Sequence, residues 1–137
     1  MKFGIVGSRE FQGASLIRKF IFELKNKLGD DLVIVSGGQP KGADGFAKKY
    51  ALEFDVKYVE FPPAHYNWNE HCIKEAYHYG KDYQGYFFFE RNTEIAKYSD
   101  VVVAFIPKLW NITDSGGTND TCEKAEKLGK KVLIMKG

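Results

Sequence analysis

Three short polar loops carry the residue types that could bind a phosphate group. Each follows an apolar run: Gly7-Ser8-Arg9, then Ser36–Asp44, then Ser115–Asp120. Their glycines lack a Cβ, so backbone N–H groups can approach an anion closely, and the start of a following helix adds partial positive charge. Loops between a buried strand and a helix are where α/β proteins place anionic ligands. The sequence therefore predicts a composite site for a phosphorylated ligand.

The Ser36–Asp44 loop offers side-chain as well as backbone groups. Lys41 could supply a full positive charge, and Asp44 could accept a hydrogen bond from a ribose hydroxyl. A tight strand-to-helix turn with Asp44 as the helix cap is an equally good explanation of the loop. The candidate ligand-binding residues here are Ser36, Gly37, Gly38, Lys41, Gly42 and Asp44, and those of the first loop are Gly7, Ser8 and Arg9.

The third loop repeats this pattern with Gly116, Gly117 and Thr118. The Thr118 hydroxyl could contact a ligand or cap the helix that follows. No lysine follows the glycines as in a P-loop, and the spaced glycines of a dinucleotide fingerprint are missing, which disfavours NAD as a redox cofactor. The three histidines have no recognised ligand spacing. We therefore expect neither a metal nor a cofactor.

Arg91 is a candidate because it follows the aromatic run Tyr86–Phe89. A guanidinium is a planar fork suited to phosphate or carboxylate. A structural salt bridge to Glu90 or Glu94 is the competing interpretation, and Arg9 has the same two interpretations.

Trp68 follows two prolines, in a loop expected after the third strand. An aromatic ring there could stack on a base. Packing in the core or in a dimer contact would explain it as well.

The alternation of apolar segments predicts the elements that position these loops. Strands and helices alternate along the chain, which favours a three-layer Rossmann-like α/β fold: a parallel sheet of about five strands with helices on both faces. If the first strand lies between the second and the fourth, all three loops meet in one crevice. We expect strands at Lys2–Val6, Leu32–Val35, Val56–Phe61, Val101–Ile106 and Lys131–Met135, and helices at Gly13–Leu28, Ala43–Phe54, 69–79, from about Arg91 to Tyr98, and Asn119–Leu128.

Composition narrows the class of protein. The chain has 137 residues, 44% hydrophobic and 28% charged, and we expect one domain over 1–137. A formal charge of +2 is too small to argue for duplex nucleic acid. No apolar run approaches the roughly 20 residues of a bilayer span, so no membrane partner is expected. Cys72 and Cys122 are interpreted as free thiols in the cytoplasm.

In chain order, these motifs resemble the SLOG superfamily, and most closely its YpsA/YspA-like branch. That superfamily unites the lonely-guy phosphoribohydrolases with the Rossmann domain of DNA-processing protein A. The resemblance covers nearly the whole chain. The matching segments are Gly7-Ser8-Arg9-Glu10-Phe11, Ser36-Gly37-Gly38 with Gly42-Ala43-Asp44, Trp68, Arg91-Asn92, Ser99–Phe105 and Gly116–Asp120.

The resemblance implies roles at the third loop. The lonely-guy enzymes cleave the N-glycosidic bond of nucleoside 5′-monophosphates with an arginine and a glutamate. Arg91 takes the place of that catalytic arginine, and Asn92, in the place of the lysine beside it, becomes a ligand-binding candidate. Thr121 stands where those enzymes have the glutamate. Asp120, one residue away, is the candidate catalytic carboxylate, and Glu123 is a more distant alternative.

Three functions fit these residues. The missing glutamate favours a protein that senses or sequesters a nucleotide or phosphoribosyl ligand without turnover. Arg91 and the glycine loops favour a phosphoribohydrolase or related N-glycosidase. Single-stranded DNA binding is the third function, and the weak net charge argues against it. Relatives of this kind are commonly dimers, so we expect a homo-oligomer.

Overall fold

The computed structural model describes residues 1–137, and its five strands form one parallel sheet. The strands are β1 (Lys2–Gly7), β2 (Val33–Ser36), β3 (Lys57–Glu60), β4 (Val101–Ile106) and β5 (Lys131–Lys136). Their order is β3-β2-β1-β4-β5, so β1 lies between β2 and β4 as predicted. The Rossmann-like α/β fold is thereby confirmed.

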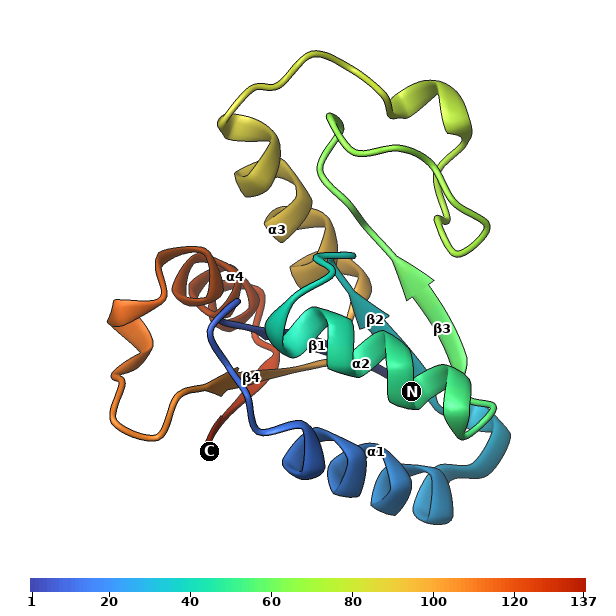
Figure 1. The fold of residues 1–137 in the computed structure, drawn as a ribbon, viewed down its shortest axis with the longest axis vertical. Helices are drawn as coiled ribbons and strands as arrows, with labels where there is room; N and C mark the ends of the chain where they lie inside the picture. Colours follow the sequence, from blue (N-terminus) through green and yellow to red (C-terminus); the bar gives the residue numbers. More distant parts are fainter.

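Four helices cover the two faces of the sheet (Figure 1). They are α1 (Ala14–Leu28), α2 (Gly42–Glu53), α3 (Tyr86–Tyr98) and α4 (Gly116–Lys127), with short 3-10 turns at Gly29–Asp31, Ala76–His78 and Ile112–Asp114. α1 packs beside α2 on one face, and α3 packs beside α4 on the other. Each helix falls short of the length or the apolar character that a membrane span requires.

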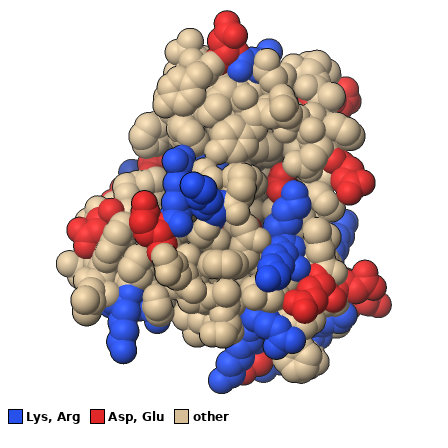
Figure 2. All heavy atoms as spheres, viewed as in Figure 1, with Lys and Arg blue, Asp and Glu red and all other residues tan.

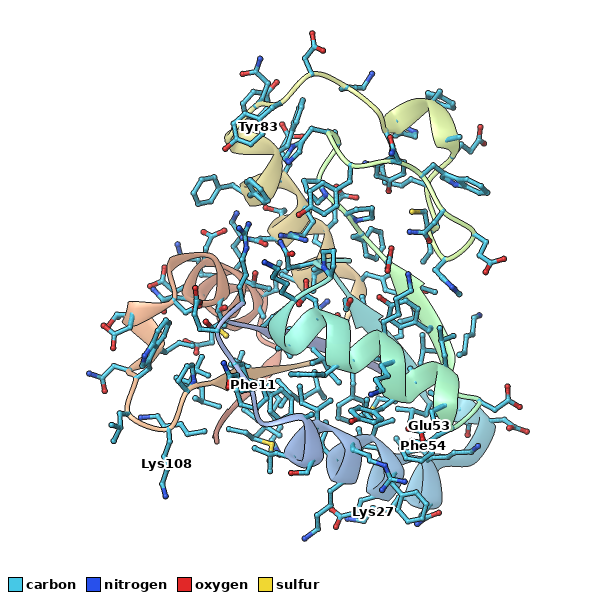
Figure 3. The ribbon with its side chains drawn as sticks, in the orientation of Figure 1. Phe11, Lys27, Glu53, Phe54, Tyr83 and Lys108 are labelled. Atoms are coloured by element: carbon cyan, nitrogen blue, oxygen red, sulfur yellow. The ribbon has the colours of Figure 1, made fainter.

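The core has two halves, one on each side of the sheet. Successive side chains of a strand point to opposite faces, so Ile5 packs toward α1 and α2 while Val6 packs toward α3 and α4. Phe11, directly after the first polar loop, is buried in the α1–α2 half (Figure 3). This burial anchors the loop that follows β1.

The helix predicted over residues 69–79 is wrong. Only a 3-10 turn forms there, at Ala76–His78. The backbone at His71 is instead bonded to the last residue of β3, because Glu60 N donates to His71 O at 3.0 Å. The Asn69 side chain also accepts a hydrogen bond from His71 N at 2.8 Å. The long segment between β3 and α3 therefore runs as a loop away from the sheet (Figure 1).

Two helices begin earlier than predicted. α3 begins at Tyr86 rather than near Arg91, and α4 begins at Gly116 rather than Asn119. Glycine has a low helix propensity, which is why a loop was expected there. The first helical turn needs no backward hydrogen bond from its N–H groups, so Gly116 and Gly117 can form it.

Candidate functional site

A cavity of about 380 Å³ opens where β1 and β4 end. Residues from all three polar loops line it, together with the N-terminal half of α3. The lining residues are Val6, Gly7, Ser8, Arg9, Glu10, Gln39, Asp44, Phe88, Phe89, Arg91, Asn92, Ile95, Ser115, Gly117, Thr118 and Thr121.

The first loop turns at the end of β1 and contributes one exposed cation. Ser8 is buried: its Oγ donates to Glu10 Oε2 at 2.7 Å and accepts from Glu10 N at 3.0 Å. Arg9 is exposed and makes no hydrogen bond or salt bridge within the chain. Its guanidinium carbon lies 5.9 Å from the centre of the Phe88 ring. Arg9 is therefore free to pair with an anion in the cavity.

Arg91 holds the second loop while it faces the cavity. Its Nη1 donates to Gly37 O at 2.7 Å, and its Nε donates to Asn92 Oδ1 at 3.0 Å. A Cβ on Gly37 would clash with Nη1, so the glycine permits this approach. No salt bridge joins Arg91 to Glu90, and Glu94 instead pairs with Lys74 at 3.3 Å. Burial lowers the pKa of Arg91, and the Asp44 carboxylate opposes that shift.

Asp44 is a buried carboxyl that lines the same cavity. Burial raises its pKa to about 6, although the Arg91 guanidinium and the Gln39 N–H act to lower it. Asp44 Oδ2 accepts from Gln39 N at 3.3 Å, and no side chain caps the start of α2. The alternative of Asp44 as the cap of α2 is therefore not seen.

Asn92 joins α3 to the first turns of α4. It is buried, and its Nδ2 donates to Gly117 O and to Asp120 Oδ2, each at 3.2 Å. Lys124 Nζ donates to the same Asp120 oxygen at 2.8 Å. Asp120 does not line the cavity. The candidate catalytic carboxylate thus lies outside the cavity and is engaged by two neighbours, Asn92 and Lys124.

The N-terminus of α4 leaves backbone donors at the cavity. No side chain caps it, and the first backward hydrogen bond runs from Asn119 N to Ser115 O at 2.8 Å. A Cβ on Gly116 or on Gly117 would meet nothing within 4 Å, so the space beside these glycines is open. Ser115 Oγ donates to Thr118 Oγ1 at 2.7 Å. This end of α4 has the backbone groups and dipole that favour an anion.

Several predicted site residues lie outside the cavity. Ser36 is fully buried, with its hydroxyl 2.8 Å from that of Tyr58. Tyr58 in turn donates to Glu60 Oε1 at 2.8 Å. Trp68 is 48% exposed on the loop beyond β3, and Lys41 is exposed. The candidates that do not line the cavity are Ser36, Gly37, Gly38, Lys41, Gly42, Trp68, Gly116 and Asp120.

Glu60 organises the back of the second loop. It is almost fully buried and receives hydrogen bonds from Tyr58 and from Asn69, with Lys48 Nζ 3.2 Å from Oε1. Burial acts to raise its pKa, but these partners outweigh burial, and the pKa lies below its ordinary value. Glu60 thereby supports the loop that carries Gly37 without facing the cavity.

The lining residues that the sequence prediction did not select are Val6, Glu10, Gln39, Phe88, Phe89, Ile95, Ser115 and Thr121. Gln39 and Ser115 lie within the predicted polar loops and Glu10 directly follows one, so selecting every residue in and next to the loops would have found them. There was less reason in the sequence to select Phe88 and Phe89, because a run of aromatic residues is typical of a hydrophobic core. Lys108, in the loop after β4, points away from the molecule (Figure 3).

Charge around the cavity is mixed. Arg9 and Arg91 line it together with the carboxyl groups of Glu10 and Asp44. Figure 2 shows Lys and Arg side chains near the middle of this face, below the segment between β3 and α3 that is uppermost in the view (Figure 1). No group of three or more His, Cys, Asp or Glu side chains is placed to hold a metal ion. The donor set suits an organic anion with hydroxyl groups.

The fold and the position of the cavity define a Rossmann-like α/β protein with a crevice at the point where the strand order reverses. Residues 3–71 match the model of the YspA, cpYpsA-related SLOG family. The chain belongs to this family. The matched residues include the first two polar loops, whereas Arg91 and α4 lie beyond them.

Solved structures with this fold cover almost the whole chain. The molybdenum cofactor binding protein from Rippkaea orientalis has a TM-score of 0.67 at 19% identity, over 99% of this chain and 76% of that one. DNA processing protein A from Helicobacter pylori has a TM-score of 0.67 at 24% identity, over 98% of this chain and 64% of that one. The molybdenum cofactor carrier protein from Chlamydomonas reinhardtii has a TM-score of 0.64 at 16% identity, over 97% and 74%. No curated protein matches the sequence.

Proposed function

We propose that this protein binds a nucleotide or a nucleotide-derived phosphoribosyl ligand in the cavity and acts as a sensor or sequestering protein. One observation carries the proposal: Arg9, Arg91 and the uncapped N-terminus of α4 all face one cavity. Two guanidinium groups and a helix N-terminus are a suitable set of donors for a phosphate group.

The carboxyl groups of the cavity support a ligand that also carries hydroxyl groups. Asp44 and Glu10 would repel a polyphosphate, but they can accept hydrogen bonds from ribose hydroxyls. A volume of about 380 Å³ lies near the small end of ligand pockets, which run from roughly 300 to 1,000 Å³. Mixed charge and small size together favour a mononucleotide or a sugar phosphate.

The ligands for which the neighbouring structures are named are consistent with this proposal. One neighbour is described by its single-stranded DNA binding mode, and two are described as binding or carrying the molybdenum cofactor. DNA is a polymer of phosphate groups and nucleosides. Binding of single-stranded DNA by the present chain remains a weaker candidate, because its formal charge is only +2.

Binding without turnover is favoured by the surroundings of Asp120. A catalytic carboxylate must reach the reacting atoms, and Asp120 is held by Asn92 and Lys124 outside the cavity. Thr121, which does line the cavity, has no carboxyl group.

A second candidate function, hydrolysis of an N-glycosidic bond, is favoured by Asp44. This buried carboxyl lines the cavity, and its pKa of about 6 lies in the range of a general acid or base at neutral pH. A turnover assay distinguishes the two functions: release of free base from a nucleoside 5′-monophosphate by the wild type, lost in Asp44→Asn, supports the enzyme.

The binding proposal is tested by removing the exposed cation. Arg9→Gln should weaken binding of nucleoside 5′-monophosphates by about 10- to 100-fold, because a hydrogen bond to a charged group contributes about 1.5–3 kcal/mol. Isothermal titration calorimetry at fixed ionic strength measures the dissociation constants. Arg9 has no hydrogen-bond or ion-pair partner within the chain, so the variant should fold normally.

Arg18→Gln is the matched control, because Arg18 lies on α1 away from the cavity, where it contacts Glu53 at 3.9 Å and the Phe54 ring at 5.1 Å. It should bind as the wild type does. Equal affinity of wild type and Arg9→Gln, or equal weakening in both variants, would contradict the proposal. A response to oligodeoxynucleotides alone would favour the DNA-binding function instead.

A further inference from the structure

Phe88 and Phe89 are the hydrophobic lining residues whose side chains a molecule in the cavity could reach. Only four of its 16 lining residues are hydrophobic. Two of these, Val6 and Ile95, are buried in the core half beneath α3 and α4 and expose 5% and 1% of their surface. Phe89, by contrast, is 54% exposed. A ligand in the cavity therefore meets aromatic rings on one side and polar groups elsewhere.

The rings belong to the first turn of α3, and Phe88 lies about one turn before Arg91. The guanidinium carbons of Arg9 and Arg91 lie 5.9 and 5.7 Å from the centre of the Phe88 ring. The two candidate phosphate-binding cations are thus next to the aromatic wall. A molecule whose anionic group pairs with either arginine would place its next few atoms against Phe88 or Phe89.

We propose that Phe88 and Phe89 form a subsite for a nucleobase, so that the ligand is a nucleoside 5′-monophosphate rather than a sugar phosphate without a base. This inference rests on the proposed phosphate-binding function of the same cavity. Every nucleobase has a planar face that stacks on an aromatic side chain, and a sugar phosphate has no such face. The subsite replaces Trp68 as the aromatic partner of the base, since Trp68 does not line the cavity.

The test compares adenosine, guanosine, cytidine and uridine 5′-monophosphates with ribose 5-phosphate. Dissociation constants of the wild type and of Phe89→Ala are measured by titration calorimetry. Stacking should make at least one nucleotide bind about 5- to 150-fold more tightly than ribose 5-phosphate to the wild type. Phe89→Ala should remove most of that preference and leave binding of ribose 5-phosphate unchanged.

Tyr86→Ala is the matched control, because Tyr86 lies on the same turn of α3 and is 55% exposed but does not line the cavity. It should keep the nucleotide preference of the wild type. Ribose 5-phosphate binding as tightly as every nucleotide would overturn the base subsite and leave phosphate binding intact. If Phe89→Ala weakened the binding of nucleotides and of ribose 5-phosphate equally, the base subsite would also be overturned. Failure of all five compounds to bind the wild type would overturn the proposed function itself.

Discussion

Arg91 combines a structural and a proposed ligand-binding role. Its Nη1 fixes the Gly37 carbonyl, its Nε contacts Asn92, and its guanidinium still lines the cavity. Replacing Arg91 would therefore change the loop and the site together. Arg9, which has no such partners, is the cleaner probe of charge. Arg91 both shapes the cavity and faces it, whereas Arg9 only faces it.

Asp44 should make stability depend on pH. Its pKa is about 6 in the folded protein, against 3.8 for an ordinary aspartate. Between these values the folded chain keeps a proton that the unfolded chain has lost, so stability should fall as pH rises from 4 to 7. Asp44→Asn cannot ionise. Relative to the wild type, its free energy of unfolding should rise over that range by up to about 3 kcal/mol.

Urea denaturation of both proteins at pH 4 and pH 7 measures this difference. The asparagine side chain can still accept the hydrogen bond from Gln39 N, so the loop should remain folded. A stability difference between variant and wild type that stays constant with pH would show that Asp44 titrates normally.

The positions of some residues could be predicted from the sequence, and those of others could not. Ser8, Arg9, Asp44 and Thr118 line the cavity because the loops after parallel strands meet at one edge. Asp120 could not be placed in the same way. On a helix, one residue corresponds to a rotation of about 100°, and that rotation directs Thr121 into the cavity and Asp120 toward Lys124.

At the scale of elements, the approach of β1 to α2 controls the shape of the site. Gly42, the first residue of α2, has φ of +68°, and a Cβ there would clash with Ser8 O. Ala43 N donates to the same Ser8 carbonyl at 3.3 Å. The start of α2 is thus packed directly on the first polar loop.

Gly42→Ala should be strongly destabilising, and Gly129→Ala is its matched control. Gly129 has a similar φ of +76°, but a Cβ there would meet nothing within 4 Å. The control should lose only the roughly 1–2 kcal/mol of a left-handed alanine. Gly42→Ala should lose a further 1–3 kcal/mol or so from the clash. Thermal and urea denaturation measure both losses, and equal losses would show that the contact with Ser8 is not tight.

The strands were predictable because their apolar runs are short and bounded by polar loops, and the adjacency of β1 with β2 and β4 was predicted correctly. The structure of the segment of residues 61–85 was not predictable from the sequence. A helix was expected over residues 69–79, but His71 O there accepts a hydrogen bond from Glu60 N of β3, and His71 N donates to the Asn69 side chain. The contact with β3 leaves no local pattern in the sequence.

At the scale of the whole molecule, the loops at one edge of a single sheet converge, and the proposed function depends on this convergence.

Several aromatic residues are exposed on the segment between β3 and α3 or at the start of α3. They include Trp68, Tyr77, Tyr83 and Tyr86. Tyr83 points outward near the upper end of α3 (Figure 3). The expected homo-oligomer and the cytoplasmic location remain predictions. Analytical ultracentrifugation, which gives the mass in solution, tests the oligomer.

The central claim is that separate loops bind one phosphate-bearing ligand. Amide chemical-shift mapping by NMR, with a nucleoside 5′-monophosphate titrated into the isotope-labelled chain, tests it most directly. We expect the largest saturable shifts at the backbone amides of Ser8, Arg91, Gly117 and Thr118, all with the same dissociation constant. Shifts confined to one loop, or centred on the far face around α1, would contradict a composite site.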